Sequence, residues 1–202
     1  MSKNEDLHGS APDQSSVALL LIDLIGDFEF EDGDRIFEHA LPAAEKIKAL
    51  KKRAKEHKIP VVYVNDNFGR WQSDFKKLLE HALDETVRGS PIAKILRPDE
   101  DDYFVLKPKH SGFYSTTLDT LLAYLGAKTL ILTGVATNIC VLFTANDAYM
   151  RDFELVIPGD CVAANDASEN EDTLGYLEKY LKADVRPSKE IDFEKLKLKT
   201  EN

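Results

Sequence analysis

The sequence predicts a three-layer α/β fold, in which a mainly parallel sheet lies between helices on both faces. Short apolar runs alternate with helix-period segments along the chain. This alternation requires crossovers that return over the sheet, so strands pair in parallel and helices cover both faces. A length of 202 residues with 43% hydrophobic content suits one domain with a full core. We expect a single α/β hydrolase domain at 17–194, a loose polar arm at 1–16 and a charged tail at 195–202.

Each element has its own pattern in the sequence. Residues 17–24 form a nearly unbroken apolar run, which predicts a strand buried on both faces. Apolar residues at 43, 47, 50 and 54 predict a helix that ends before Pro60. Shorter β-branched runs predict strands, and leucines three or four residues apart predict helices. In order, the remaining elements are strand 61–64, helix 75–82, strand 103–106, helix 118–125 closed by Gly126, strand 129–133, helix 138–151, strand 155–157, helix 173–181 and a sixth strand that starts at Val185.

Charge and hydropathy exclude several classes of function. A formal net charge of -10 opposes binding to the phosphates of nucleic acid. The longest apolar runs are far shorter than the roughly 20 residues of a membrane helix, and no basic-then-apolar signal segment opens the chain. Cys140 and Cys161 are too few for a disulfide framework and show no zinc spacing. We therefore expect a reduced, cytoplasmic protein with no nucleic-acid or membrane partner.

The sequence predicts no cofactor and no metal. Neither a Gly-x-Gly-x-x-Gly pattern nor a phosphate-binding loop follows any predicted strand, so nothing indicates a dinucleotide or ATP. The histidines show no metal-ligand spacing. They are His8, His39, His57, His81 and His110.

Polar side chains follow several predicted strands at the point where each strand ends. In a parallel sheet, ligands bind beyond these carboxyl ends. Cys140 is the most informative of these residues, because a thiol in the first turn of a helix lies at the positive end of the peptide dipoles, which favours thiolate. The residues at the five strand ends are Asp23, Asn65 with Asp66, Lys107, Cys140 and Asp160.

Each candidate also has an ordinary structural explanation. A lone cysteine on an amphipathic helix is usually a small core residue, and an aspartate after a strand is often a turn former. Lys107 precedes Pro108 and would then be a solvated loop charge. The combination favours a site, because Asp23, Lys107 and Cys140 would supply a base, an electrostatic partner and a nucleophile.

At these residues the sequence resembles the isochorismatase-like cysteine hydrolases, a family that includes nicotinamidases, N-carbamoylsarcosine amidohydrolases and ureidoacrylate amidohydrolases. The resemblance extends from about residue 17 to about residue 185. It implies a six-stranded, mainly parallel sheet, an Asp-Lys-Cys triad at Asp23, Lys107 and Cys140, a non-proline cis peptide before Ala136 and a homo-oligomer. The matching blocks are Leu20–Leu24, Lys107–Phe113 followed by Thr117-Leu118, and Gly134–Val141 followed by Thr144-Ala145 and Asp147-Ala148.

The resemblance also implies a mechanism. Asp23 would take the thiol proton, Cys140 would attack a carbonyl carbon, and water would hydrolyse the resulting thioester. Backbone N–H groups of Ala136 and Cys140 would bind the oxyanion. Lys107 would keep Asp23 ionised and favour thiolate. We expect the Thr137 hydroxyl to cap the helix at the Ile139 N–H.

Departures from the family narrow the substrate. Nicotinamidases carry an Asp-x-His pattern and a further histidine for a metal, whereas the matching stretch Val64–Trp71 has no histidine. Isochorismatases proper lack the nucleophilic cysteine. The presence of Cys140 therefore favours cleavage of a C–N bond in an amide, ureide or carbamoyl compound.

Residues that would bind a small substrate are predicted from their chemistry. Arg70 would bind a carboxylate through its forked donors, and aromatic side chains would enclose a planar ligand. The same residues suit loop packing or a subunit interface equally well. We interpret His110 as a polar loop residue rather than a proton shuttle, and Cys161 as packing. The substrate-binding candidates are Phe28, Asn65, Arg70, Trp71, Phe113 and Tyr114.

Our hypothesis is a cofactor-independent cysteine amidohydrolase that acts on a small molecule. The alternative is a non-catalytic binding or partner protein with the same fold, docking through the acidic loop 29–38 or the basic helix segment 46–58. A thiol redox sensor is a third reading, although no resolving cysteine lies nearby in the sequence.

Overall fold

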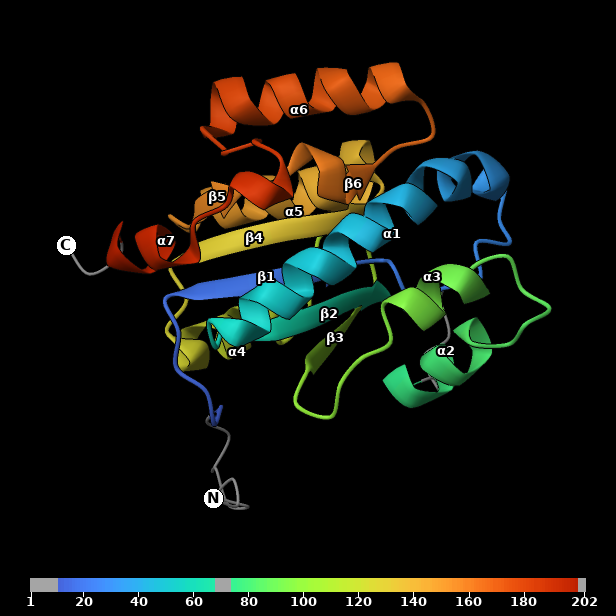
Figure 1. Cartoon of the computed structure of the whole chain (residues 1–202), viewed down its shortest axis with the longest axis horizontal. Coiled ribbons are helices and arrows are strands. Elements are labelled where there is room, and N and C mark those ends of the chain that lie inside the picture. Colours follow the sequence, from blue (N-terminus) through green and yellow to red (C-terminus); the bar gives the residue numbers. More distant parts are fainter. Residues whose placement is uncertain (1–10, 68–73, 200–202) are drawn as a thin grey trace.

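A sheet of parallel strands forms the centre of the protein, with helices on both faces (Figure 1). This computed structural model describes residues 11–67 and 74–199. The strands pair in the order β3-β2-β1-β4-β5, and β6 lies beside β4. All these pairings are parallel, so the predicted three-layer α/β fold is confirmed. The strands are β1 (Val17–Ile22), β2 (Val61–Asp66), β3 (Tyr103–Lys107), β4 (Thr129–Val135), β5 (Glu154–Val156) and β6 (Val162–Ala163).

Helices and short turns connect the strands. The α-helices are α1 (Gly33–Glu56), α2 (Phe75–Ala82), α3 (Ser90–Ile95), α4 (Leu118–Leu125), α5 (Leu142–Tyr149), α6 (Ala167–Leu181) and α7 (Phe193–Lys199). A π-helical turn, η1 (Thr137–Val141), precedes α5, and two 3-10 turns are η2 (Gly159–Cys161) and η3 (Ser188–Glu190). None of the helices described in residues 11–67 and 74–199 combines the length and apolar content of a membrane span.

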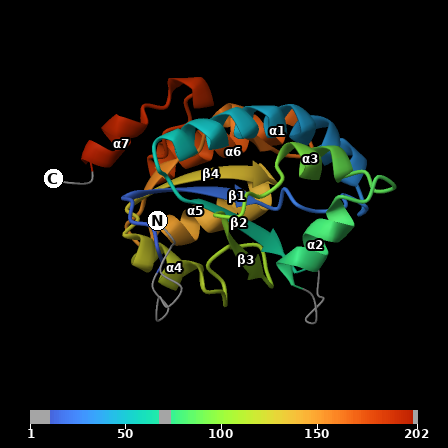
Figure 2. The same ribbon diagram turned by 60° about the horizontal axis from the view of Figure 1, so that its bottom comes forward.

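Two hydrophobic clusters lie on opposite faces of the sheet. Successive residues of a strand point to opposite faces, so Leu19 and Leu21 join one cluster while Leu20 and Ile22 join the other. The first cluster packs under α1, α2 and α3, and the second packs under α4, α5 and α6. Figure 2 shows α1 on one side of the sheet and α4 and α5 on the other. Because β1 lies between β2 and β4, all six of its residues are buried.

The sixth strand is not where the sequence predicted it. It comprises Val162–Ala163, which pair with Gly134 and Val135 of β4. Near Val185 the chain makes only an isolated bridge, between Asp184 and Val156. A two-residue strand is too short to show a periodic pattern, and a proline at 187 prevents extension of the later segment.

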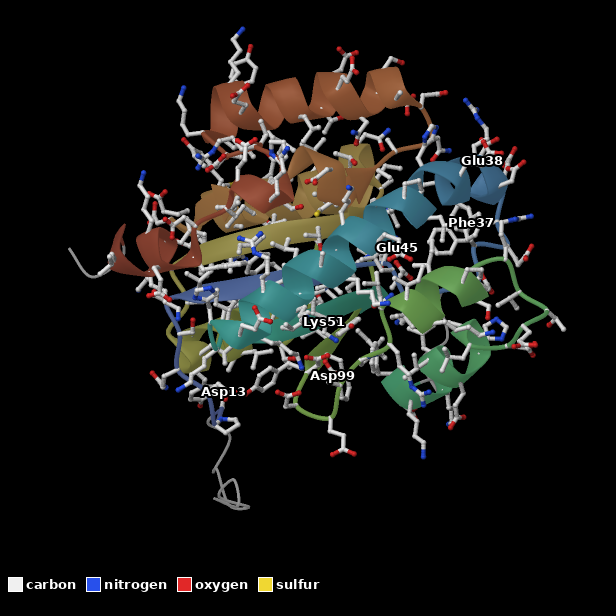
Figure 3. All side chains as sticks on the ribbon, viewed as in Figure 1. Asp13, Phe37, Glu38, Glu45, Lys51 and Asp99 are labelled. Atoms are coloured by element: carbon white, nitrogen blue, oxygen red, sulfur yellow. The ribbon has the colours of Figure 1, made fainter. Side chains whose placement is uncertain are left out.

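Three of the seven basic residues in the segment 46–58 are engaged within the protein, and the other four are exposed. Lys51 is 7% exposed, and its ammonium lies 2.6 Å from Asp102 and 3.1 Å from Asp99 (Figure 3). Lys55 contacts the same acidic loop, and Arg53 donates to the carbonyls of residues 188 and 191. Three of the seven charges are thus used for contacts within the protein, which leaves fewer for docking a partner on this helix.

The described parts of both ends pack on the domain. The Tyr103 hydroxyl donates to Asp13 at 2.6 Å, and the Ser15 N–H donates to the Leu125 carbonyl. Residues 195–199, predicted as tail, belong to α7, whose Phe193 is 1% exposed beneath the guanidinium of Arg53. Apolar residues at 191, 193 and 196 pack against the first hydrophobic cluster. This packing holds the segment on the domain although most of its other residues are charged.

Candidate active site

Three of the predicted site residues meet where the central strands end. Asp23 directly follows β1, Lys107 is the last residue of β3, and Cys140 lies in the π turn after β4. The Lys107 ammonium lies 2.8 Å from the Asp23 carboxylate and 3.5 Å from the Cys140 sulfur. The structure therefore brings a carboxylate, an ammonium and a thiol into one cluster.

Asp66 extends this cluster. Its backbone N–H donates to Asp23 at 2.7 Å, and its carboxylate lies 3.5 Å from the Lys107 ammonium. Lys107 is fully buried, and the side chain of Asp23 is 14% exposed. A buried ammonium requires nearby negative charge, which the two carboxylates supply.

The strand register places these residues together. Asp66 pairs with Lys107 across β2 and β3, while Ile22 pairs with Gly134 across β1 and β4. Gly134 has φ +117°, and a Cβ on it would lie 2.0 Å from the Ile22 carbonyl oxygen. Only glycine fits this close approach. Asp23 turns the chain at the end of β1 with φ 51°, a conformation that aspartate tolerates better than most residues.

Burial and charge set the protonation of the cluster. The pKa of Cys140 is raised to about 12, chiefly by burial and also by the Asp23 carboxylate, while Lys107 lowers it. Burial also raises the pKa of Asp23, against the opposing effect of Lys107. For Lys107, burial lowers the pKa, but Asp23, Cys140 and Asp66 together raise it above its ordinary value.

These pKa shifts overturn the expectation of a resting thiolate at a helix terminus. The sulfur lies in a desolvated position beside a carboxylate, and both effects favour the protonated thiol. The dipole of a short turn is too weak to outweigh them. A thiol in this position would have to give its proton to a neighbouring base before its sulfur could act as a nucleophile.

The turn that carries Cys140 differs from the predicted α-helix. The N–H groups of Ile139 and Val141 both donate to the Ala136 carbonyl at 3.1 Å. The Thr137 hydroxyl donates to Asn170 at 2.5 Å, so the predicted cap on Ile139 is wrong. The peptide bond between residues 135 and 136 is cis.

His110 lies at the same sulfur, which the sequence analysis did not foresee. Its Nδ1 is 4.0 Å from Cys140 Sγ, and its ring lies 5.4 Å from that of Phe143. His110 is exposed, in contrast to Lys107. The sequence shows that His110 comes three residues after Lys107, at the end of a strand. A single loop residue has no periodic pattern, so the direction of its side chain could not be predicted.

Among the predicted substrate-binding residues that the structure describes, Phe28 and Phe113 lie in hydrophobic clusters on opposite faces of the sheet. Phe28 is 3% exposed and packs against Phe37 in the first hydrophobic cluster. Phe113 is 5% exposed and packs beneath Arg151. Both aromatic rings therefore belong to the hydrophobic core. Tyr114 is exposed. The predicted residues Arg70 and Trp71 lie outside the described residues.

Asn65 is buried at the end of β2. Its Nδ2 donates to the Ile25 carbonyl at 2.8 Å, and its Oδ1 has no hydrogen-bond partner among the described residues. Asp160 has a structural task, since its carboxylate accepts from the N–H and hydroxyl of Ser188. Cys161 is fully buried in the first hydrophobic cluster, in agreement with its interpretation as packing.

Comparison with known proteins identifies the class. Residues 17–188 match the model of the isochorismatase domain. The uncharacterized isochorismatase family protein YaaI of Bacillus subtilis is 42% identical over 174 residues, which are 86% of this chain and 95% of that protein. The crystal structure of N-carbamoylsarcosine amidase from Thermoplasma acidophilum superimposes with a TM-score of 0.68 at 27% identity, covering 88% of this chain and 99% of that one.

Two further relatives have named activities. Nicotinamidase/pyrazinamidase of Bacillus subtilis has a TM-score of 0.62 at 27% identity and covers 85% of this chain and 99% of its own. Ureidoacrylate amidohydrolase of Methylorubrum extorquens is 43% identical over 69 residues, which are 34% of this chain and 28% of that protein. The chain belongs to the isochorismatase family. It is an isochorismatase-like hydrolase, as the sequence resemblance predicted.

Proposed function

We propose that the protein is a cysteine amidohydrolase that cleaves a C–N bond of a small amide, ureide or carbamoyl compound through a thioester. The observation that carries this proposal is the cluster itself, in which Lys107 lies 2.8 Å from Asp23 and 3.5 Å from the Cys140 sulfur. Nucleophilic catalysis needs a nucleophile, a base within reach and a charged partner. The names of the amidase and amidohydrolase relatives support the same reaction class.

Acylation begins with removal of the thiol proton. Asp23 takes the proton as the sulfur of Cys140 attacks the carbonyl carbon, and a raised pKa makes the carboxylate a stronger base. Lys107 stabilises the negative charge that the sulfur gains. We propose that the N–H groups of Ala136 and Cys140 bind the oxyanion, because Ala136 begins the turn that carries the sulfur. Asp23 then gives the proton to the departing nitrogen, the C–N bond breaks, and a thioester remains.

The proposed steps use only side chains and backbone of this chain, with no cofactor or metal. Within the described residues, the group suited to a metal is Asp99, Asp101 and Asp102. These aspartates precede β3, at the opposite end of that strand from Lys107, and they pair with Lys51 and Lys55. They therefore take no part in the proposed reaction.

We propose that Asn65, which was predicted from the sequence, binds the substrate. A buried acceptor without a partner is costly, and a substrate N–H would satisfy it. Amides, ureides and carbamoyl compounds all offer such a donor. Arg70 and Trp71 remain predicted substrate contacts, and the exposed ring of Tyr114 remains a candidate at the rim.

We propose a cytoplasmic location and a homo-oligomeric assembly. The reaction requires a reduced thiol, and both cysteines are free. Large apolar side chains are exposed on the neighbouring helices α5 and α6, as expected for a subunit interface. They include Tyr149, Met150, Tyr176 and Tyr180.

An ammonia-release screen over amides, ureides and carbamoyl compounds tests the proposed function. We expect at least one class of compound to be hydrolysed, and we expect Cys140→Ala to abolish that turnover while the protein keeps its circular dichroism and unfolding midpoint. Cys161→Ala is the matched control, because that thiol is sealed in packing. Full turnover by a folded Cys140→Ala protein would contradict the proposal.

A further inference from the structure

The Cys140 sulfur has two nitrogen neighbours of different kinds. The Lys107 ammonium, 3.5 Å away, is fully buried and paired with carboxylates. The His110 imidazole, with its Nδ1 4.0 Å away, is exposed. Water that enters the site from solvent therefore meets the imidazole rather than the ammonium.

The loop that carries His110 is fixed to the helix that follows Cys140. The Ser111 hydroxyl donates to Asp147, and the Gly112 N–H donates to the Thr144 hydroxyl at 3.0 Å. That same hydroxyl donates to the Cys140 carbonyl at 2.7 Å. Hydrogen bonds thus join the loop directly after His110 to the turn and helix that carry Cys140.

Thioester hydrolysis needs a proton acceptor for water and a proton donor for sulfur. After acylation Asp23 is again a carboxylate, but it is held 2.8 Å from the buried ammonium of Lys107, with its side chain 14% exposed, whereas His110 is exposed to solvent. An imidazole takes up and releases protons near neutral pH, which suits both tasks. His110 is the exposed group of this type in contact with the sulfur.

We infer that His110 is the general base and then the general acid of the second half-reaction. This inference rests on the proposed function. Nδ1 takes a proton from water as the water oxygen bonds to the thioester carbonyl carbon. The C–S bond then breaks, the imidazolium returns the same proton to the sulfur of Cys140, and the acid departs. One thioester and one water give one acid and one thiol.

Charged side chains from several elements lie in or beside the described site. Asp23 follows β1, Asp66 and Lys107 end β2 and β3, Lys109 precedes His110, and Asp147 and Arg151 lie on and just after α5. Variants of His110 leave these groups in place, so a change in the pH profile of deacylation reports on the imidazole.

The test uses p-nitrophenyl acetate, an activated ester that separates the two half-reactions. Acetylation of Cys140 releases a burst of nitrophenolate, and the later steady rate measures thioester hydrolysis. We expect His110→Gln to keep the burst amplitude, to lower the steady rate at least ~10-fold and to accumulate acetylated Cys140 in the intact mass spectrum. The pH profile of the steady rate should differ between the wild-type protein and the variant.

A chemical rescue separates proton transfer from packing. We expect added imidazole to restore the steady rate of His110→Ala, whereas His39→Ala, which removes an exposed histidine of α1, should match the wild type with and without imidazole. Equal loss of burst and steady rate in His110→Gln, or an unchanged steady rate, would overturn the assignment of His110 alone. Lack of a Cys140-dependent burst in the wild-type protein would overturn the proposed function, and with it this inference.

Discussion

Two charges of opposite sign act on the sulfur of Cys140. Burial has the largest effect and raises the pKa of the thiol, Asp23 raises it as well and Lys107 lowers it, and the net result is a pKa of about 12. The positions of these residues could be predicted, because each follows a recognisable strand. The sign of the net pKa shift could not be predicted, because it depends on how completely the folded chain excludes water around the sulfur.

Removal of the Asp23 charge should therefore make the thiol more acidic. In Asp23→Asn, Lys107 remains beside the sulfur without a competing carboxylate, so we expect the pH midpoint of Cys140 alkylation by iodoacetamide to fall below its wild-type value. Hydrolysis should be lost at the same time, because the base is missing. Asp66→Asn is the control, since Asp66 contacts Lys107 rather than the sulfur. A higher midpoint in Asp23→Asn would contradict this account.

The pH dependence of acylation should report Asp23. Its carboxylate must be ionised to accept the thiol proton, so we expect the rate of acylation to fall as the pH drops through the pKa of Asp23. Because burial raises this pKa, the fall should be centred above the ordinary value of 3.8. The measurement is the burst rate with p-nitrophenyl acetate between pH 4 and 8. A fall centred below 3.8 would mean that Lys107 outweighs burial.

Among the elements, β4 and its turn fix the site most closely. The strand was predicted from its β-branched run, but the π turn was not, because its hydrogen bonds depend on how the chain leaves the strand. Helix α1 begins ten residues before its predicted start, since Ile36 and Ala40 continue the buried face and the helix includes Pro42. The six-residue helix α3 was missed because it is too short to show a period.

Gly134→Ala should disrupt the contact between β1 and β4. A Cβ at this position would meet the Ile22 carbonyl oxygen at 2.0 Å, in a backbone conformation with φ +117° that alanine rarely adopts. We expect a loss of about 2 kcal/mol or more in the free energy of unfolding, measured in urea. Gly175→Ala in α6 is the matched control, because nothing lies within 4 Å of its Cβ. That variant should gain roughly 0.5–1 kcal/mol from helix propensity.

For the whole molecule, the predicted boundary at residue 194 cuts through α7. Phe193 fills the first hydrophobic cluster, and we expect Phe193→Ala to lower the free energy of unfolding by about 3–5 kcal/mol. Leu198→Ala, on the same helix but 61% exposed, should change it by less than about 0.5 kcal/mol. Urea unfolding distinguishes the two. Equal, small effects would mean that α7 is a dispensable tail.

The assembly proposed above can be measured directly. Light scattering should give a mass of two or more chains, and Met150→Glu combined with Tyr180→Glu should reduce it if the exposed apolar face of α5 and α6 lies between subunits. Phe104→Glu, an exposed aromatic on the edge strand β3, is the control. A single-chain mass for the wild-type protein would refute the assembly. The sequence offered no independent signal for it, because interface residues share no period.

The buried ammonium of Lys107 also limits which substitutions this protein can accept during evolution. Loss of Asp23 alone would leave a buried positive charge with weaker compensation, and loss of Lys107 alone would leave a buried carboxylate. Breaking such a pair costs roughly 3–5 kcal/mol, a large part of the 5–15 kcal/mol that holds a typical domain together. A descendant freed from selection for turnover would thus lose its cysteine easily but would keep the acid and the amine. An inactive paralogue that kept Asp23 and Lys107 without Cys140 would therefore have descended from an active hydrolase.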